Sequence, residues 1–135
     1  MTVLLDTNVV LDLLQKREPF YECSAEIMQR IEKAEFNCFV SVNSLSDFFY
    51  LYAKETTISQ ARSALAYILE KIDVGSLDGD DCKSAMNLPI KDFEDALIMQ
   101  CGLKYKVDYV ITRDLKLQRN GVVNTLSPIE FLSML

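Results

Sequence analysis

Short apolar runs that stop at polar residues recur along the chain and constrain its fold more than any other feature. The first comprises residues 3–5, which are too few for a helix and predict a buried strand that ends at Asp6. Similar runs predict further strands at residues 38–40, 72–77 and 108–114, and a short edge strand at residues 121–124. Because helical patterns separate these runs, the sequence predicts an α/β fold with a mostly parallel central sheet of four to five strands and helices on both faces.

Apolar residues at helical spacing predict the segments between the strands. The expected helices span residues 9–14, 21–34, 44–53, 59–71 and 96–105, with a short one ending at residue 86 and a last one opened by Ser127 and Pro128. The chain has 135 residues, 50% of them hydrophobic, and predicts one domain over residues 1–135. It has no basic leader and no apolar run of membrane-spanning length, so we expect a soluble cytoplasmic protein.

The residue types that the chain lacks exclude several kinds of chemistry. It contains no histidine, which removes imidazole bases and histidine-assisted serine or cysteine nucleophiles. Its four cysteines are scattered without a CxxC pair and predict free packing thiols rather than a zinc site. The formal net charge of −6 argues against nucleic-acid binding by a broad basic face, whereas acids that bind divalent cations are compatible with a nuclease. Any chemistry must therefore use carboxylates, hydroxyls and metal ions.

Acidic residues follow the predicted strands at points that a parallel sheet brings together. Asp6 follows the first strand, Asp47 the second and Asp114 the fourth. Asp92 and Asp95 share one face at the start of a helix. The carboxyl ends of parallel strands lie at one edge, where ligands bind in open α/β sheets. Each acid also has an ordinary alternative role, as a helix cap or as a first-turn residue that complements the helix dipole. Their joint placement favours one acidic crevice.

Three sequence motifs together resemble those of a known family. They are Asp6-Thr-Asn8 after an apolar strand, the stretch Lys91-Asp-Phe-Glu-Asp-Ala-Leu97 that opens a helix, and Tyr109-Val-Ile-Thr-Arg-Asp114. In this combination and order they are similar to the PIN-domain ribonucleases, and above all to the VapC-type toxins of bacterial toxin-antitoxin pairs. The likeness covers essentially the whole chain, including residues 11–21 and 126–131. It implies a PIN-like three-layer fold.

The resemblance implies a metal site made of four acids. The family's first acid falls on Asp6, its third on Asp95 and its last on Asp114, and these three are expected to hold Mg²⁺ or Mn²⁺ directly or through water. The second acid, often glutamate in the family, falls on Asp47, whose shorter side chain is expected to contact the metal through a water or to orient the attacking water. Such an ion lowers the pKa of a bound water and orients it for attack on a phosphodiester.

Further residues near these motifs have supporting roles in this interpretation. Those expected to position the metal ligands by hydrogen bonds are Asn8, Thr7 and Thr112, with Asp92 and Glu94 at the periphery. The candidate phosphate contacts are Lys91, Arg113 and Lys116, with Lys16, Arg17 and Arg119 as further cations near the same edge. Arg113 ranks first because it adjoins Asp114, although a solvated surface charge is the ordinary alternative for each cation.

The resemblance also implies partners. RNA is the expected substrate, and a cognate antitoxin is expected to cover the acidic crevice. Residues 48–52 make one predicted helix apolar nearly all round. Burial in the core explains most of that stripe, and we expect the remainder to form a homodimer or antitoxin contact.

Two alternatives come from other functional classes. The first is a catalytically silent PIN-like domain that only binds a protein, with its acids as caps and surface charge. The second is a magnesium-dependent aspartyl phosphoryl-transfer domain, which also uses acids at strand ends. A haloacid-dehalogenase-like pattern has a second acid two residues after the first, where this chain has Asn8, so the second alternative is the weaker one.

Overall fold

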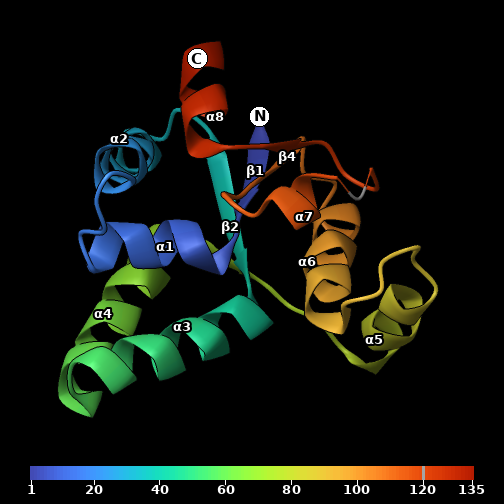
Figure 1. Ribbon diagram of the computed structural model, residues 1–135, viewed down its shortest axis with the longest axis horizontal. Coiled ribbons are helices and arrows are strands. Elements are labelled where there is room, and N and C mark those ends of the chain that lie inside the picture. Colours follow the sequence, from blue (N-terminus) through green and yellow to red (C-terminus); the bar gives the residue numbers. More distant parts are fainter. Residues whose placement is uncertain (120) are drawn as a thin grey trace.

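A computed structural model describes residues 1–119 and 121–135 and contains five parallel strands (Figure 1). They are β1 (Thr2–Leu5), β2 (Asn37–Ser41), β3 (Asp73–Gly75), β4 (Tyr109–Ile111) and β5 (Thr125–Leu126). The order across the sheet is β3-β2-β1-β4-β5, and every pair of neighbours is parallel. The α/β prediction is confirmed, and the described sheet is wholly rather than mostly parallel.

Eight helices connect and cover the described strands. They are α1 (Thr7–Leu14), α2 (Tyr21–Glu32), α3 (Val42–Glu55), α4 (Ile58–Lys71), α5 (Gly79–Met86), α6 (Phe93–Lys104), α7 (Leu115–Gln118) and α8 (Pro128–Met134). None of the helices in the described part of the chain is both long and apolar enough to cross a lipid bilayer. All four cysteines are free, and Cys38 and Cys101 are buried as packing thiols.

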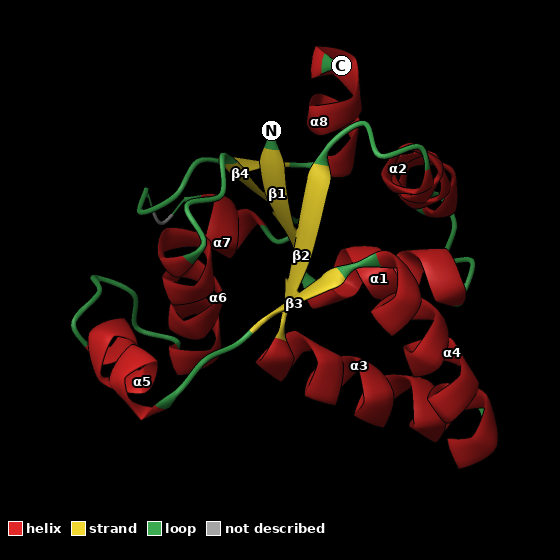
Figure 2. Ribbon diagram, turned by 180° about the vertical axis from the view of Figure 1, so that it is seen from behind, coloured by secondary structure: helices red, strands yellow, loops and turns green. Residues whose placement is uncertain are grey.

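The helices form layers on both sides of the sheet. Figure 2 shows α5, α6 and α7 on one side, and α1, α2, α4 and α8 on the other. The strand period of two divides the side chains of β1 between two cores, because Val3 and Leu5 pack on the α1 side and Leu4 packs against α6. All three are buried, as expected for a central strand covered on both faces. The predicted three-layer arrangement is confirmed.

Several element boundaries differ from the prediction for local reasons. The edge strand lies at Thr125–Leu126 rather than at residues 121–124, because Gly121 has a left-handed φ of 74° and the chain pairs with β4 only beyond it. Asp92 caps α6, so this helix begins at Phe93 rather than at residue 96. Ser41 caps α3, which begins at Val42 and puts Asp47 in its second turn rather than its first.

The topology places a crevice at the carboxyl ends of β1 and β4. These two strands are neighbours, but the chain leaves β1 into α1 on one face and leaves β4 into α7 on the other. Connections that diverge to opposite faces leave a gap between them, which is the usual ligand position in open parallel sheets. In Figure 1 the starts of α1 and α3, together with α6, surround the ends of these central strands.

Candidate active site

Helix caps fix the backbone at three of the predicted acids. Asp6 follows β1 directly and caps α1, accepting from the Thr7 amide at 2.8 Å. Asp92 caps α6 by accepting from the Asp95 amide at 3.0 Å. Asp114 caps α7 by accepting from the backbone N–H of residue 116 at 2.9 Å. All three acids are therefore helix caps, and capping holds the Asp6 and Asp114 carboxylates at helix starts beside the crevice.

Thr112 ties the acid after β1 to the acid after β4. Its fully buried hydroxyl donates to Asp6 Oδ2 at 2.7 Å and accepts from the Asp114 amide at 2.9 Å. The Asn8 side-chain amide donates to Asp6 Oδ2 at 3.2 Å and to Thr112 Oγ1 at 3.3 Å. A partly buried network of hydrogen bonds of this kind restricts the orientation of its members. It connects Asn8 and Thr112, expected to position metal ligands, to the expected ligands Asp6 and Asp114.

All of the predicted acids except Asp92 line one cavity of about 450 Å³. It is lined by Asp6, Thr7, Asn8, Leu11, Arg17, Asp47, Tyr50, Leu51, Glu94, Asp95, Ile98 and Asp114. The four acids expected to be catalytic come from four separate segments, so the fold brings together residues up to about a hundred positions apart. Thr112 lies beneath the cavity rather than in its lining, and Asp92 and Lys91 are exposed outside it.

Burial and mutual repulsion raise the pKa of the acid at the base of this cavity. Removal from water raises the pKa of Asp6 above its ordinary value of 3.8, and the hydrogen bond from Thr112 offsets part of that rise. The negative charges of Asp114 and Asp47 raise it further, which places the three carboxylates within electrostatic range of one another. Burial also raises the pKa of Asp47.

Asp95 has a raised pKa for the same reasons. Desolvation is the largest cause, followed by repulsion from Asp92, Asp114 and Asp6, while the positive charge of Lys116 acts in the opposite direction. A carboxylate pKa above its unfolded value means that ionisation opposes folding at neutral pH. The opposition is complete above the raised pKa and disappears as the pH falls towards 3.8. The cavity is therefore a site of excess negative charge that a cation would relieve.

The donor set fits a hydrated divalent cation rather than a closed metal cage. Within the described residues, no group of three or more histidine, cysteine or acidic side chains stands close enough to enclose an ion. Mg²⁺ needs no such cage, since one or two carboxylates and several waters satisfy it. Carboxylate oxygens suit Mg²⁺ and Mn²⁺, and both ions fit a cavity whose acids repel one another.

A comparison with protein-family models matches residues 2–116 of the chain to the PIN domain. The chain belongs to the PIN-domain family. In the VapBC2 complex from Rickettsia felis bound to a promoter DNA fragment, one chain matches this PIN domain with a TM-score of 0.71 at 18% identity, over 94% of this chain and 98% of that chain. VapC20 from Mycobacterium tuberculosis, a sarcin-ricin loop cleaving toxin, matches with a TM-score of 0.70 at 16% identity, over 88% of this chain and 95% of that chain.

A toxin-antitoxin complex from Klebsiella pneumoniae also matches, with a TM-score of 0.70 at 19% identity over 93% of this chain and 97% of that chain. At these identities the solved structures establish a common fold with the PIN-domain chain. No curated protein sequence matches it.

The structure corrects the expected ranking of cations around this PIN-domain site. Arg113 does not line the cavity, because its Nε and Nη2 bind the two carboxylate oxygens of Asp12 at 2.6 and 3.0 Å. Its guanidinium also stacks on Phe20, 3.8 Å from the ring centroid. Arg17 is instead the cation that lines the cavity in the described part of the chain. Lys116 lies near enough to influence Asp95.

Two features of the PIN-domain site were not found from the sequence. Asp12 is fully buried in a stripe of apolar residues, and a buried acid needs a partner. Its spacing of four residues from Asn8 puts both on one helix face, which is a signal that could have identified it. The second feature is which residues of the apolar stretch 48–52 stay exposed: Tyr50 and Leu51 do, and they form an apolar wall of the cavity.

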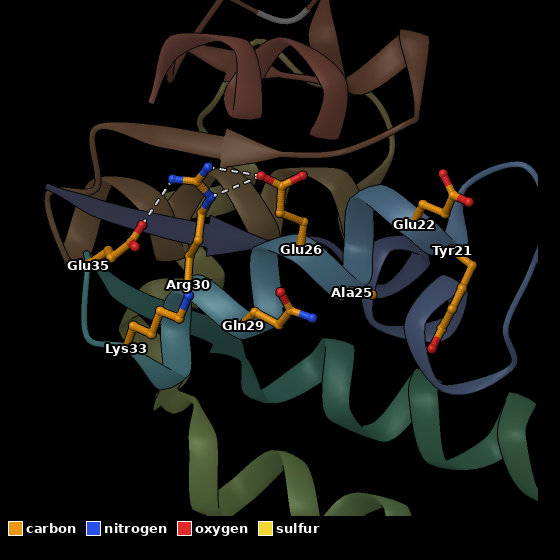
Figure 3. Close-up of a pocket in the computed structure, with 8 residues that line it drawn as sticks. All are labelled: Tyr21, Glu22, Ala25, Glu26, Gln29, Arg30, Lys33 and Glu35. Atoms are coloured by element: carbon orange, nitrogen blue, oxygen red, sulfur yellow. Dashed lines mark hydrogen bonds and ion pairs between the residues drawn. The ribbon is translucent and has the colours of Figure 1, made fainter.

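Another hollow on the PIN domain has different chemistry. It lies along the outer face of α2 and shares no lining residue with the acidic cavity. Figure 3 shows the Arg30 guanidinium between Glu26 and Glu35, with N–O distances of 2.9 and 3.1 Å. Because these charges satisfy one another in solvent, this hollow has the character of an ordinary charged helix surface.

We expect Thr112→Val to weaken Mn²⁺ binding by roughly 10- to 100-fold, the usual effect of removing a hydrogen bond that orients a metal ligand. The substitution deletes the donor to Asp6 and the acceptor for the Asp114 amide while keeping a similar volume. Calorimetric titration with Mn²⁺ measures the effect. Thr125→Val, which removes a hydroxyl bonded to Gln118, is the control. Equal Mn²⁺ affinities for wild type and Thr112→Val would contradict the positioning role.

Proposed function

We propose that this PIN-domain protein is a metal-dependent endoribonuclease that hydrolyses RNA phosphodiester bonds. The single observation that supports this most strongly is the convergence of Asp6, Asp47, Asp95 and Asp114 on one cavity, where burial raises the carboxylate pKa values of the first three. Perturbed acids of this kind cluster at functional sites. In the absence of histidine, a divalent ion is the available means of activating water.

Each side chain has a distinct role in the proposal. Asp6, Asp95 and Asp114 would hold Mg²⁺ or Mn²⁺ directly or through water, and Asp47 would bind the ion or orient the attacking water. When bound, such an ion would supply a water of lowered pKa and neutralise charge at the phosphate. Thr112 and Asn8 hold Asp6 in position. Asp92 holds the start of α6 and so the backbone of Asp95, while Glu94 lies at the edge of the cavity.

Partners follow from the nature of the structural relatives. Several matching chains come from toxin-antitoxin complexes, and one is a toxin that cleaves the sarcin-ricin loop. We therefore propose that the protein acts as a VapC-type toxin in the cytoplasm, as one domain that binds a cognate antitoxin and pairs with a second copy. Sedimentation of the purified toxin alone and with its antitoxin measures both associations, and a monomer at all concentrations would contradict the homodimer.

The aspartyl phosphoryl-transfer alternative is disfavoured by the residue two positions after Asp6. A haloacid-dehalogenase-like site has a second acid there, whereas this chain has Asn8, whose side-chain amide donates to Asp6 Oδ2 at 3.2 Å. The silent protein-binding alternative differs from the nuclease in its response to metal, so a metal-dependent cleavage experiment distinguishes the two.

The test is cleavage of a mixed pool of structured RNAs by the purified protein with Mg²⁺ or Mn²⁺. Cleavage is expected with either ion, and none is expected in excess EDTA or with the Asp6→Asn, Asp95→Asn double variant. The variant must match wild type in secondary structure by circular dichroism. Absence of cleavage in every sample, with no stabilisation by Mn²⁺, would favour the silent protein-binding domain.

A further inference from the structure

One wall of the acidic cavity is apolar and carries an exposed aromatic ring. Tyr50 and Leu51 from α3 line this wall, and these residues are 65% and 39% exposed. Tyr50 lies three residues after Asp47, so the two share one face of the helix and both border the cavity. A large aromatic side chain is thus presented to solvent beside the acids.

Tyr50 has no structural role comparable to that of its neighbours. Phe48 is 1% exposed and Tyr52 packs against it, with ring centroids 5.5 Å apart, so these two residues fix α3 to the core. In the described chain, Tyr50 has no hydrogen-bond or ring partner. Its ring is therefore free to receive a planar group that enters the cavity.

Arg17 adds a cation to the same space. Its backbone is fixed, since its N–H donates to Asp12 O at 3.0 Å and its carbonyl accepts from Phe20 N and Tyr21 N at 2.9 and 2.8 Å. The side chain is half-buried, lines the cavity and forms no ion pair with a described acid. A single arginine in a cavity lined by several carboxylates suits an anionic group of a ligand, such as a phosphate.

We infer that Tyr50 and Arg17 form a nucleotide subsite in which an unpaired RNA base stacks on the Tyr50 ring and Arg17 binds an adjoining phosphate. The inference rests on the proposed function and deepens it by naming what selects the substrate. Stacking on an aromatic side chain requires a base that has left its duplex, because paired bases already stack on their neighbours. The neighbouring phosphodiester then lies over the carboxylates. The subsite therefore favours unpaired nucleotides with little dependence on base identity.

The affinity for a short single-stranded RNA, measured in the presence of Ca²⁺, tests the stacking role of the Tyr50 ring. Loss of one stacked base weakens binding by about 5- to 150-fold, and this is the decrease expected for Tyr50→Leu, which keeps an apolar side chain without a π face. Tyr50→Phe restores most of the affinity. Ile129→Ala, an exposed apolar residue outside the cavity, is the control. Oligonucleotides that lack a single base complete a double-mutant cycle between protein and RNA. At one position the missing base should weaken RNA binding by wild type and leave RNA binding by Tyr50→Leu unchanged.

The salt dependence of the same binding reaction tests Arg17. Each phosphate neutralised on a single strand contributes about 0.7 to the slope of log K against log salt concentration. Arg17→Gln should reduce the slope by that amount. Arg62→Gln makes the same change of charge on an exposed residue of α4 outside the cavity and should leave the slope unaltered.

The possible outcomes separate the subsite from the nuclease. If wild type cleaves RNA but Tyr50→Leu binds RNA as tightly as wild type does, the subsite is overturned and the nuclease is not. Wild type that neither binds nor cleaves RNA would overturn both. A change in sedimentation for Tyr50→Leu would assign the ring to a contact between copies and also overturn the subsite. A duplex RNA that binds as tightly as the single strand would contradict the selection of unpaired bases.

Discussion

Replacing Asp95 with asparagine is expected to lower metal-dependent RNA cleavage by more than about 100-fold, because a direct or water-linked metal ligand should matter at least as much as the groups that orient one. The same substitution should raise the Tm of the metal-free protein. Asparagine removes a charge that burial and the carboxylates of Asp92, Asp114 and Asp6 disfavour. Single-turnover cleavage and metal-free thermal unfolding measure the two effects.

The pH dependence of that Tm difference follows from the raised pKa of Asp95. Above the raised pKa the wild-type carboxylate is charged and unfavourable, so the asparagine variant is the more stable protein. As the pH falls towards 3.8, wild type gains a proton and the difference disappears. Asp73→Asn, at an exposed acid of β3, is the control and should change neither quantity. A lower metal-free Tm for Asp95→Asn at neutral pH would contradict the repulsion between the acids.

Replacing Asp12 with alanine is expected to lower the free energy of unfolding by about 3 kcal/mol, the lower end of the range for a broken buried ion pair. Asp12 is fully buried and binds the Arg113 guanidinium at two points. The lower end applies because the Arg113 side chain is 27% exposed and regains some water when its partner is lost. Urea unfolding followed by circular dichroism measures the change.

A double variant tests whether apolar packing can replace the Asp12–Arg113 ion pair. Buried ion pairs replaced by apolar residues of similar size are often neutral or stabilising. Asp12→Leu, Arg113→Met should therefore recover most of the stability lost in Asp12→Ala, since methionine can still pack on Phe20. A double variant as unstable as the single one would show that the pair has a role that packing does not replace.

The fold was predictable where a local signal coincided with the tertiary arrangement. Residues 3–5 are apolar, short and followed by a cap, and they form the central strand β1. The edge strand was misplaced because residues 122–123 are as apolar as a strand, whereas Gly121 and the register with β4 decide where pairing begins. The α7 helix was not predicted, since four residues are too few to show a period.

The candidate site was predictable to the extent that it depends on topology. Asp6, Asp47 and Asp114 follow predicted strands whose carboxyl ends a parallel sheet brings to one edge, and the resemblance to PIN domains added Asp95 to them; all four line the cavity. Arg113 was misjudged because its partner Asp12 is 101 residues away, and adjacency to an acid in sequence says nothing about where a long side chain points. In the same way, an apolar stretch does not reveal which of its aromatic side chains remains exposed.

Adjacent residues of α3 illustrate this last point. Residues 48–52 are apolar nearly all round, and the sequence assigns most of them to the core. Phe48 does lie in the core, but Tyr50 is exposed at the cavity because α3 packs through its other face. Which face of an apolar helix is covered depends on its neighbours, in this case α1 and α4.

The acidic cavity of this PIN domain is expected to bind a divalent cation, and a Mn²⁺ titration of thermal stability tests this most directly. Mn²⁺ at about 100 times its Kd is expected to add about 2.7 kcal/mol to the free energy of unfolding of wild type. It should add almost nothing to the Asp6→Asn, Asp95→Asn variant, with KCl holding ionic strength constant. Equal stabilisation of both proteins, or of neither, would contradict the metal site.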